Sequence, residues 1–178
     1  MSPATEAARD SAWQPAYIGL GSNLEDPRQQ VRRALARLGE LPRTRLIASS
    51  RLYGSTPFGP VPQPPYVNAV AGLLTQLLPL ELLHALRDVE AAFGRPAVHE
   101  KWGPRVLDLD LLVYGRVRQE SPGLTLPHPG IVERNFVLYP LAEIAPELDV
   151  PGLGRVAELK SRVSCEGIEL IEGATPAP

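Results

Sequence analysis

Cysteine is almost absent from the 178 residues, because Cys165 is the only one. A single thiol excludes an internal disulfide and a zinc site built from several cysteines, and it fits a reducing compartment. Lysine is nearly as rare, so all basic residues other than Lys101 and Lys160 are arginines. Arginine suits two-pronged contacts with phosphate or carboxylate groups, although an arginine-rich coding bias would produce the same composition.

A charge excess of one sign and long apolar runs are missing as well. The 18 basic and 20 acidic residues give a net charge of −2, which leaves no basic field for nucleic acid as the main partner. No apolar run reaches the roughly 18 residues of a membrane span, and residues 1–14 lack the apolar stretch of a secretory signal. We therefore expect a cytoplasmic protein with no nucleic-acid and no membrane partner.

Proline and glycine, by contrast, are abundant, at 20 and 15 residues. Together they make up roughly a fifth of the chain, just below the share at which disorder is the default expectation. The 44% of hydrophobic residues is enough for one sizeable core at this length. We expect a single domain over residues 15–172, a disordered tail at 1–14 and a second tail at 173–178.

Hydrophobic periodicity predicts alternating strands and helices in the first two thirds of the chain. Asp26 caps one helix that begins at Pro27, Pro79 begins a second helix, and Gly39 and Gly94 end them. The predicted strands cover residues 16–20, 45–53, 66–76 and 106–114. The resulting β-α-β-β-α-β order is typical of a ferredoxin-like α+β fold, an antiparallel sheet with helices packed on one face.

Weaker patterns follow the last of these strands. We expect a short return strand near Val117, a helix over 131–144 with a kink at Pro140, a small helix over 156–161 and a strand over 168–171. The segments rich in proline and glycine are expected to be loops, which the proline rings stiffen. These loops cover residues 54–65, 95–105 and 121–130.

Two carboxylates interrupt the most apolar of the predicted strands. Residues two apart on a strand point to one face, so Asp108 and Asp110 lie side by side with Cα atoms about 6.6 Å apart. Carboxylates on an apolar strand need water or a cation, and Mg²⁺ prefers one or two carboxylates together with substrate phosphates. The pair by itself also fits an edge strand whose polar face is solvated.

The loop before this strand is rich in cations. Arg95, Lys101 and Arg105 lie within eleven residues of one another, and arginine with Mg²⁺ recurs in sites that neutralise a transferring phosphoryl group. Trp102 either closes over a ligand or anchors the loop on the core, and the neighbouring Gly103 favours a mobile loop.

Other polar residues have both a functional and a structural explanation. His128, between two prolines, can contact a phosphate or cap the next helix. Asn68, inside a predicted strand, can bind the hydrogen-bonding edge of a heterocycle or satisfy the neighbouring backbone. Glu90, in the last turn of the second helix, can accept hydrogen bonds from ribose hydroxyls or pair with Arg87.

Four short motifs occur in the order and spacing of one enzyme family. They are YIGLGSNL (17–24), QPPYVNA (63–69), WGPR with the following DLD (102–110), and LPHP (126–129). Each motif is weak alone, but together they are specific. Over roughly residues 16–150 the chain resembles the 6-hydroxymethyl-7,8-dihydropterin pyrophosphokinases of folate biosynthesis. The resemblance implies a ferredoxin-like fold and transfer of pyrophosphate from ATP to the pterin hydroxymethyl group, with release of AMP.

The resemblance also implies roles for individual residues. Asp108 and Asp110 hold two Mg²⁺ ions that bridge the phosphates of the co-substrate ATP, and Arg95 and Arg105 stabilise charge on the transferring group. Tyr66 and Phe136 sandwich the pterin ring. The full pterin-binding set is Ser55, Thr56, Phe58, Tyr66, Asn68, Trp102 and Phe136. The full ATP-binding set is Glu90, Trp102, Arg105, Leu111, Thr125, His128 and Arg134. We expect these small molecules as partners of a monomeric protein.

The chain departs from the family pattern in two places. Family members often carry an arginine where Ala97 stands here, and Lys101 and His99 are the candidates to replace it. Phe58 stands where a smaller aliphatic residue is common.

Two other functions remain open from the residues themselves. A nucleotidyltransferase also combines a Gly-Ser turn with an Asp-x-Asp pair, although here Ser22 lies far along the chain from Asp108. A non-catalytic module that binds a pterin or a nucleotide is the second alternative.

Overall fold

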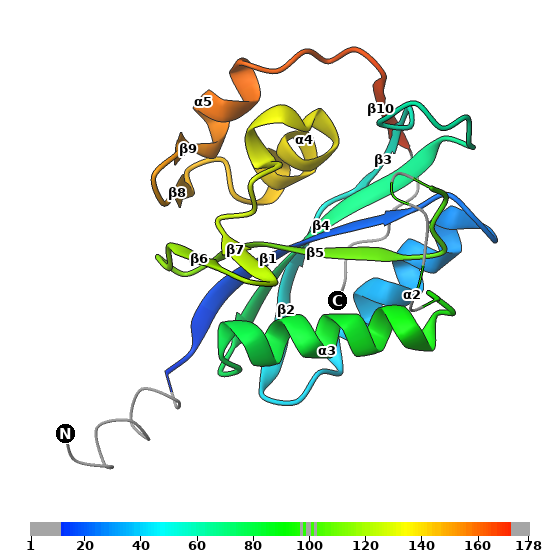
Figure 1. Cartoon of the computed structure of the whole chain (residues 1–178). Coiled ribbons are helices and arrows are strands. Elements are labelled where there is room, and N and C mark those ends of the chain that lie inside the picture. The colour runs from blue at the N-terminus through cyan, green and yellow to red at the C-terminus, as the bar shows by residue number, and fades with distance from the viewer. Residues whose placement is uncertain (1–11, 97, 99–100, 102, 172–178) are drawn as a thin grey trace, which may run out of the picture.

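The computed structural model describes residues 12–96, 98, 101 and 103–171. The predicted tail at 173–178 and most of the predicted tail at 1–14 lie outside these residues. The described part forms one large antiparallel sheet with helices on both of its faces (Figure 1).

Six strands form the sheet in the order β10-β3-β4-β1-β5, and β2 also pairs with β4. All of these pairings are antiparallel. The α+β class and the antiparallel sheet predicted from the sequence are therefore confirmed. The strands are β1 (Gln14–Ser22), β2 (Thr44–Ser49), β3 (Leu52–Ser55), β4 (Tyr66–Thr75), β5 (Asp108–Tyr114) and β10 (Ile168–Ile171).

The single strand predicted over residues 45–53 is wrong, because the chain bends at Ser50 and forms β2 and β3. β2 pairs with the end of β4, whereas β3 pairs with its beginning. Ser50 fixes the bend, since its backbone N donates to the carbonyl of Val70 and its Oγ accepts from the Val70 N–H, both at 2.9 Å. Both halves of the predicted strand thus stay on the same edge of β4.

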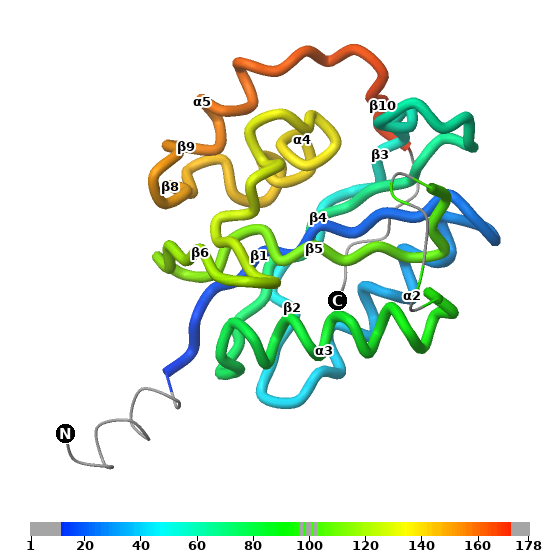
Figure 2. The backbone as a smooth tube through the Cα atoms, viewed as in Figure 1, coloured from blue at the N-terminus to red at the C-terminus, as the bar shows by residue number. Residues whose placement is uncertain are grey.

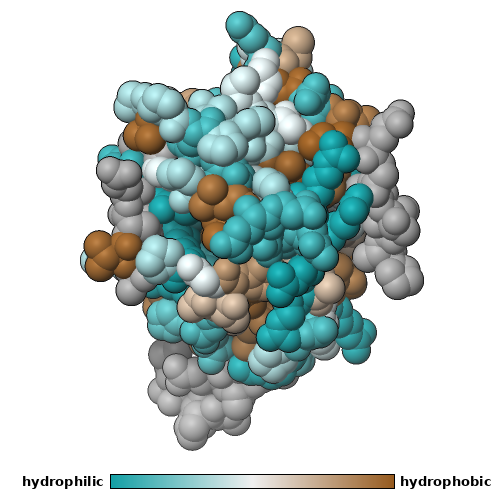
Figure 3. Space-filling view, turned by 90° about the vertical axis from the view of Figure 1, so that its right-hand side faces the viewer, coloured by the Kyte–Doolittle hydropathy of each residue, from teal (hydrophilic) through white to brown (hydrophobic). Residues whose placement is uncertain are grey.

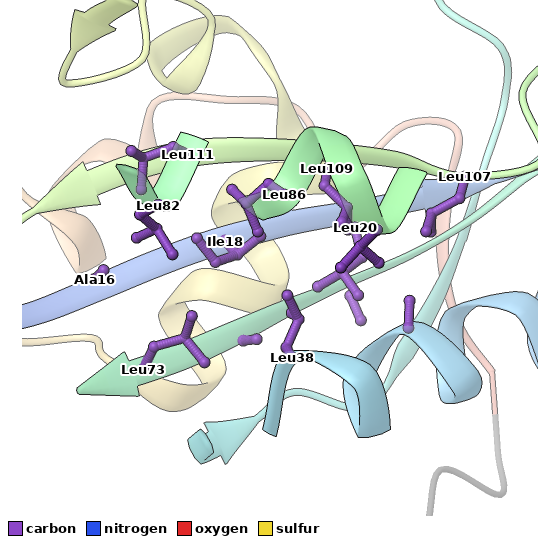
Figure 4. Packing of buried hydrophobic residues seen from close by; sticks show 14 of the residues in the cluster. Ala16, Ile18, Leu20, Leu38, Leu73, Leu82, Leu86, Leu107, Leu109 and Leu111 are labelled. Carbon is purple, nitrogen blue, oxygen red and sulfur yellow. The ribbon is translucent and has the colours of Figure 1, made fainter. Parts of the chain in front are cut away.

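Helices α2 (Pro27–Gly39) and α3 (Pro79–Ala92) lie along one face of the sheet (Figure 1). Both begin at a proline as predicted, and Asp26 Oδ1 accepts from the backbone N of Gln29 at 3.3 Å to cap α2. Their apolar side chains meet those of β1, β4 and β5 in one buried cluster. Figure 4 shows ten labelled members of this cluster: Ala16, Ile18, Leu20, Leu38, Leu73, Leu82, Leu86, Leu107, Leu109 and Leu111.

A second layer covers part of the opposite face, which corrects the expectation of helices on one face only. The layer consists of the 3₁₀ turn η1 (Ile131–Glu133), α4 (Asn135–Ile144) and α5 (Val156–Ser161). Val70 and Leu112 of the sheet pack against Leu138 in this layer. The register between β1 and β5 shifts at Leu112, so that adjacent residues Leu112 and Val113 both belong to this cluster. None of the described helices is long and apolar enough to cross a membrane.

Two short hairpins are not predicted by the sequence patterns. The short strand expected near Val117 begins two residues later, at Gln119, because the Val117 N–H closes a turn onto the carbonyl of Tyr114 at 2.9 Å. It pairs with residues 124–126 and does not return along β5. The loop expected over 121–130 is wrong in part, because the buried Leu124 and Leu126 belong to a strand. The hairpins pair β6 (Gln119–Ser121) with β7 (Leu124–Leu126) and β8 (Asp149–Val150) with β9 (Gly154–Arg155).

The later helices and the last strand follow the predictions more closely. The helix expected over 131–144 begins as η1, is interrupted at Arg134 and continues as α4, with Pro140 inside it. α5 and β10 have the predicted ranges. β10 joins the outer edge of β3 and so returns the end of the described chain to the main sheet (Figure 1).

Candidate active site

The part of the sheet face that α4 leaves open carries the predicted site. Antiparallel register places Gly21 of β1 between Asn68 of β4 and Asp108 of β5, and it places Gly19 beside Asp110. Because side chains alternate along a strand, these positions share one face, while their neighbours fill the core beneath.

Gly19 and Gly21 have no side chains, so the space above β1 on this face stays open. A Cβ atom on Gly21 would stand 3.4 Å from Oδ1 of Asn68 and 3.6 Å from a ring carbon of Tyr66. A Cβ atom on Gly19 would stand 3.5 Å from the side chain of Leu112. Larger side chains at either position would fill the space above the strand. The two glycines therefore form a floor of backbone, a role to which the sequence patterns do not point.

A cavity of about 330 Å³ lies over this floor. It brings together most residues of the predicted site. They are Ser55, Thr56, Phe58, Tyr66, Asn68, Arg95, Arg105, Asp108, Asp110, His128, Arg134 and Phe136. Lys101, a candidate for the role of the missing loop arginine, also lines the cavity. Ala97, His99 and Trp102 lie outside the described residues.

Three predicted ATP-binding residues are not among the described residues that line the cavity. The side chain of Leu111 points into the core on the other face of the sheet. Thr125 lies in β7, opposite Glu120 in the hairpin. Glu90 is only 4% exposed and its carboxylate bonds to the backbone of β5. Strand alternation accounts for Leu111, which follows Asp110 and therefore points to the other face of β5, and burial accounts for Glu90.

Among the carboxyl groups that line the cavity, Asp110 has the pKa that is most strongly shifted by its surroundings. Enclosure and then the neighbouring Asp108 raise the pKa of Asp110 to about 7. His128 Nε2 and Arg134 Nη1 each lie 3.7 Å from its carboxylate. Burial, followed by Arg134, lowers the pKa of His128 to about 4, so His128 is neutral at pH 7 and Arg134 is the cation that faces Asp110. A further cation that binds here would favour the ionised carboxylate.

Arg95 joins two carboxylates at the other side of the acid pair. Its Nη1 lies 3.0 Å from Oδ1 of Asp108 and also contacts the carboxylate of Glu90. Glu90 accepts from the backbone N of Leu109 at 2.7 Å, and burial raises the pKa of Glu90 against the opposing effects of this bond and of Arg95. Glu90 therefore pairs with Arg95, not with the alternative partner Arg87, and it holds Arg95 close to β5.

The opposite end of the cavity combines an amide with aromatic rings. Asn68 donates through Nδ2 to Oγ of Ser55 at 2.7 Å and to the carbonyl of Tyr53 at 3.3 Å. Both hydrogens of this nitrogen are thus used within the protein, and Oδ1 is the atom that Asn68 offers to a ligand. The rings of Phe58 and Phe136 meet edge to face, with centroids 6.4 Å apart.

Asn23 ties the proline-rich loop before β4 to the cationic loop before β5. Its Nδ2 donates to Oε1 of Gln63 and to the next carbonyl in the chain, both at 2.9 Å. Its Oδ1 accepts from the backbone N of Arg105 at 2.8 Å. The hydroxyl of Tyr66 adds a hydrogen bond to the carbonyl of Gly103 at 3.2 Å. The motif contains Asn23, but only the fold shows that it joins the two loops.

The donor set of the cavity suits Mg²⁺ better than a metal that the protein encloses by itself. Among the residues that the structure describes, no group of three or more histidine, cysteine or acidic side chains is arranged to hold a metal ion. Asp108 and Asp110 supply two carboxylates, and Mg²⁺ completes such a shell with water and substrate phosphates.

Comparison with known proteins identifies close relatives. Residues 17–146 match the family model described as 7,8-dihydro-6-hydroxymethylpterin-pyrophosphokinase (HPPK). The 2-amino-4-hydroxy-6-hydroxymethyldihydropteridine pyrophosphokinase of Pseudomonas aeruginosa is 48% identical over 162 residues, which cover 90% of this chain and 99% of that protein. The protein of the same name from Haemophilus influenzae is 45% identical over 144 residues, covering 81% of this chain and 89% of that protein.

Solved structures agree on the fold. A crystal structure of Plasmodium falciparum HPPK-DHPS has a TM-score of 0.68 with 14% sequence identity, and the match covers 85% of this chain. This chain spans 45% of that longer one, so the likeness concerns the fold of one part of it. From the family match and the identity to its relatives, the chain belongs to the 7,8-dihydro-6-hydroxymethylpterin-pyrophosphokinase family.

Proposed function

We propose that the cavity above β1, β4 and β5 is the active site of this pyrophosphokinase. The protein transfers pyrophosphate from ATP to 6-hydroxymethyl-7,8-dihydropterin in folate biosynthesis and releases AMP. The observation that carries the proposal is the convergence of the acid pair, the loop cations and Asn68 on one cavity of about 330 Å³. The family match sets aside the nucleotidyltransferase and the non-catalytic module as alternatives.

The acid pair is the proposed metal site. Asp108 and Asp110 would hold Mg²⁺, two ions in our proposal, which when bound neutralises the phosphates and orients them for attack. Arg95 and Arg134 now lie beside these carboxylates, at 3.0 and 3.7 Å. The two arginines are thus placed to turn from the carboxylates to the ATP phosphates, whose charge is of the same sign.

The loop cations are the proposed groups that stabilise the transition state. The pterin hydroxyl oxygen forms a bond to the β-phosphorus, while the bond from this phosphorus to the α–β bridging oxygen breaks and AMP leaves. Phosphoryl-type transfer depends mainly on position and charge, so no strong general base is required. Arg95 and Arg105 take the main roles, His128 and Arg134 bind ATP, and Lys101 adds a further positive charge to the cavity.

The amide end of the cavity is the proposed pterin site. Asn68 offers the acceptor Oδ1, which suits the N–H groups along the edge of a pterin ring. Ser55 and Thr56 line the same end of the cavity, and Phe58, Tyr66 and Phe136 supply aromatic surface there. Phe58 meets Phe136 edge to face, and a pterin ring that binds between Tyr66 and Phe136 would displace this contact.

We further propose a monomeric, cytoplasmic protein without nucleic-acid or membrane partners. The near-neutral net charge of −2 and the lone cysteine support this. On the face shown in Figure 3, apolar side chains of the described residues lie in small groups between hydrophilic ones. Analytical ultracentrifugation at micromolar concentration would test the monomer.

A product assay tests the proposed site. With ATP, Mg²⁺ and the pterin, the wild-type protein should release AMP, and D108A and D110A should each lose orders of magnitude in turnover while keeping the folded circular-dichroism spectrum. D149A, which removes an exposed carboxylate of β8, is the matched control and should keep full activity. Release of ADP, or full activity of both site variants, would contradict the proposal.

A further inference from the structure

The chain between α5 and β10 runs past the start of α4 to the edge of the sheet. Figure 2 shows this connection as an arch from α5 to β10. We call residues 162–167 the strap. The strap lies after residue 146, the last residue that the family model matches. Its two attachments are nevertheless to residues beside the active-site cavity.

The first attachment is to α4. Asn135, the first residue of that helix, donates through Nδ2 to the carbonyls of Ser164 and Glu166, both at 2.9 Å. The residues on either side of it, Arg134 and Phe136, line the cavity. A single side chain therefore connects the strap to the helix end that presents the proposed ATP and pterin contacts.

The second attachment is to β3. The backbone N of Thr56 donates to the carbonyl of Gly167 at 2.9 Å, and the first residue of β10 pairs with Ser55. Ser55 and Thr56 line the active-site cavity and also a second cavity of about 380 Å³ that Gly167 lines. The strap thus contacts the proposed pterin-binding end of β3 directly.

Glycine is required at the second attachment. Gly167 has a φ of 73°, and a Cβ atom there would stand 2.6 Å from Oγ1 of Thr56. The strap also has internal hydrogen bonds, because the backbone N of Glu166 donates to Oγ of Ser164 at 3.0 Å. The strap is therefore bonded to α4 through Ser164 and Glu166 and to the end of β3 through Gly167.

We propose that the strap is a positioning element for the pterin site, with Asn135 as its positioning residue. It sets the distance between Ser55 and Thr56 on one side of the pterin ring and Phe136 on the other. This inference rests on the proposed assignment of those residues to the pterin. Asn135 also directly follows Arg134, a proposed ATP contact, so we expect the strap to affect ATP binding less than pterin binding.

Steady-state kinetics with separate titration of the two substrates tests the proposal. N135A removes both hydrogen bonds and should raise the KM for the pterin about threefold to tenfold. The KM for ATP should rise less than the KM for the pterin, and kcat should change less than twofold. A purely structural role would instead lower the active fraction, and therefore kcat, with both KM values unchanged.

N135D separates the strap contact from helix stability. An aspartate in the first turn of a helix is stabilising, yet its oxygens would face the carbonyls of Ser164 and Glu166. We expect a pterin KM at least as high as that of N135A, with the helix content measured by circular dichroism unchanged. A pterin KM equal to that of the wild type in both variants would overturn the proposal.

G167A tests the other attachment. It should raise the pterin KM as N135A does, because the new methyl group displaces Thr56. G154A is the matched control, since Gly154 also has a positive φ but no atom within 4 Å of its Cβ position. C165S changes an exposed side chain of the strap and is the second control. An equal rise in pterin KM in G154A or C165S would count against the strap.

N68A distinguishes failure of this inference from failure of the proposed pterin site. If N68A raises the pterin KM and the strap variants do not, the pterin site stands and the strap proposal is wrong. If N68A leaves the pterin KM unchanged, the proposed pterin site is wrong and the strap proposal fails with it.

Discussion

Arg95 pairs with a carboxylate of the proposed metal site and therefore competes with a metal ion for it. Its Nη1 lies 3.0 Å from Oδ1 of Asp108, and a Mg²⁺ ion on Asp108 needs the same carboxylate. Replacing Arg95 by methionine keeps much of its volume and removes the charge. We therefore predict opposite effects on two measurements. R95M should bind a divalent cation more tightly in the absence of nucleotide, and it should turn over more slowly in its presence.

The size of the first effect follows from the exposure of the pair. The side chains of Arg95 and Asp108 are 21% and 37% exposed, so solvent screening reduces the value of the pair to about 0.5–1.5 kcal/mol. Freeing Asp108 from this competition should strengthen cation binding roughly twofold to tenfold. Loss of a preorganised charge beside the transferring group should lower kcat roughly a hundredfold.

Mn²⁺ titration followed by electron paramagnetic resonance measures the first effect, and the AMP assay measures the second. R95K is the control, because it keeps the charge and should leave Mn²⁺ affinity close to that of the wild type. Since Glu90 also loses its partner in R95M, urea unfolding should first show that the variant is folded under assay conditions. Weaker Mn²⁺ binding by folded R95M would refute the reasoning.

Three further predictions concern the loops, the pH dependence of stability and the core. N23A removes the side-chain bonds that hold Arg105, so kcat should fall about tenfold while circular dichroism stays unchanged; an unchanged kcat would contradict this. Burial, then the hydrogen bond to Glu143, raises the pKa of Tyr53 from 10.0 to about 12. The unfolded chain then loses this proton first as pH rises, so stability should fall by up to about 2–3 kcal/mol between pH 10 and 12. Urea midpoints should show a shallower fall in Y53F. L82A, at a fully buried position, should lower the free energy of unfolding by about 2–5 kcal/mol in urea, and a loss below 1 kcal/mol would show that the site collapses around the deletion.

The elements that sequence reasoning predicted well have local causes. α2 follows from Asp26, Pro27 and an apolar stripe, and β5 follows from alternation around Asp108 and Asp110. β7 could not be predicted in the same way, because its short strand depends on β6 as a partner and on burial of Leu124 and Leu126. The contact of Val113 with the second helical layer also follows from the register shift between β1 and β5, which is a property of the strand pair.

The residues of the candidate site also fall into those that the sequence alone could indicate and those that depend on the fold. The acid pair, the loop cations, Trp102, His128, Glu90 and Asn68 could be selected from residue type and position, and the family resemblance supplied the remaining assignments. The glycine floor and Asn23 require knowledge of which strands and loops are neighbours. The position of Leu111 on the opposite face of β5, by contrast, follows from alternation along the strand and argues against its predicted role in ATP binding.

The position at which α4 begins has a consequence for how substrates relate to the fold. One face of the sheet is shared between Val70 and Leu112, which lie beneath the helical layer, and Asn68 and the acid pair, which lie in the open cavity. In the proposed complex the pterin ring covers part of the sheet face that α4 leaves open, so the substrate and the second layer cover different parts of that face. A helix long enough to cover Asn68 and the acid pair as well would bury this face completely and leave no open site for the substrates.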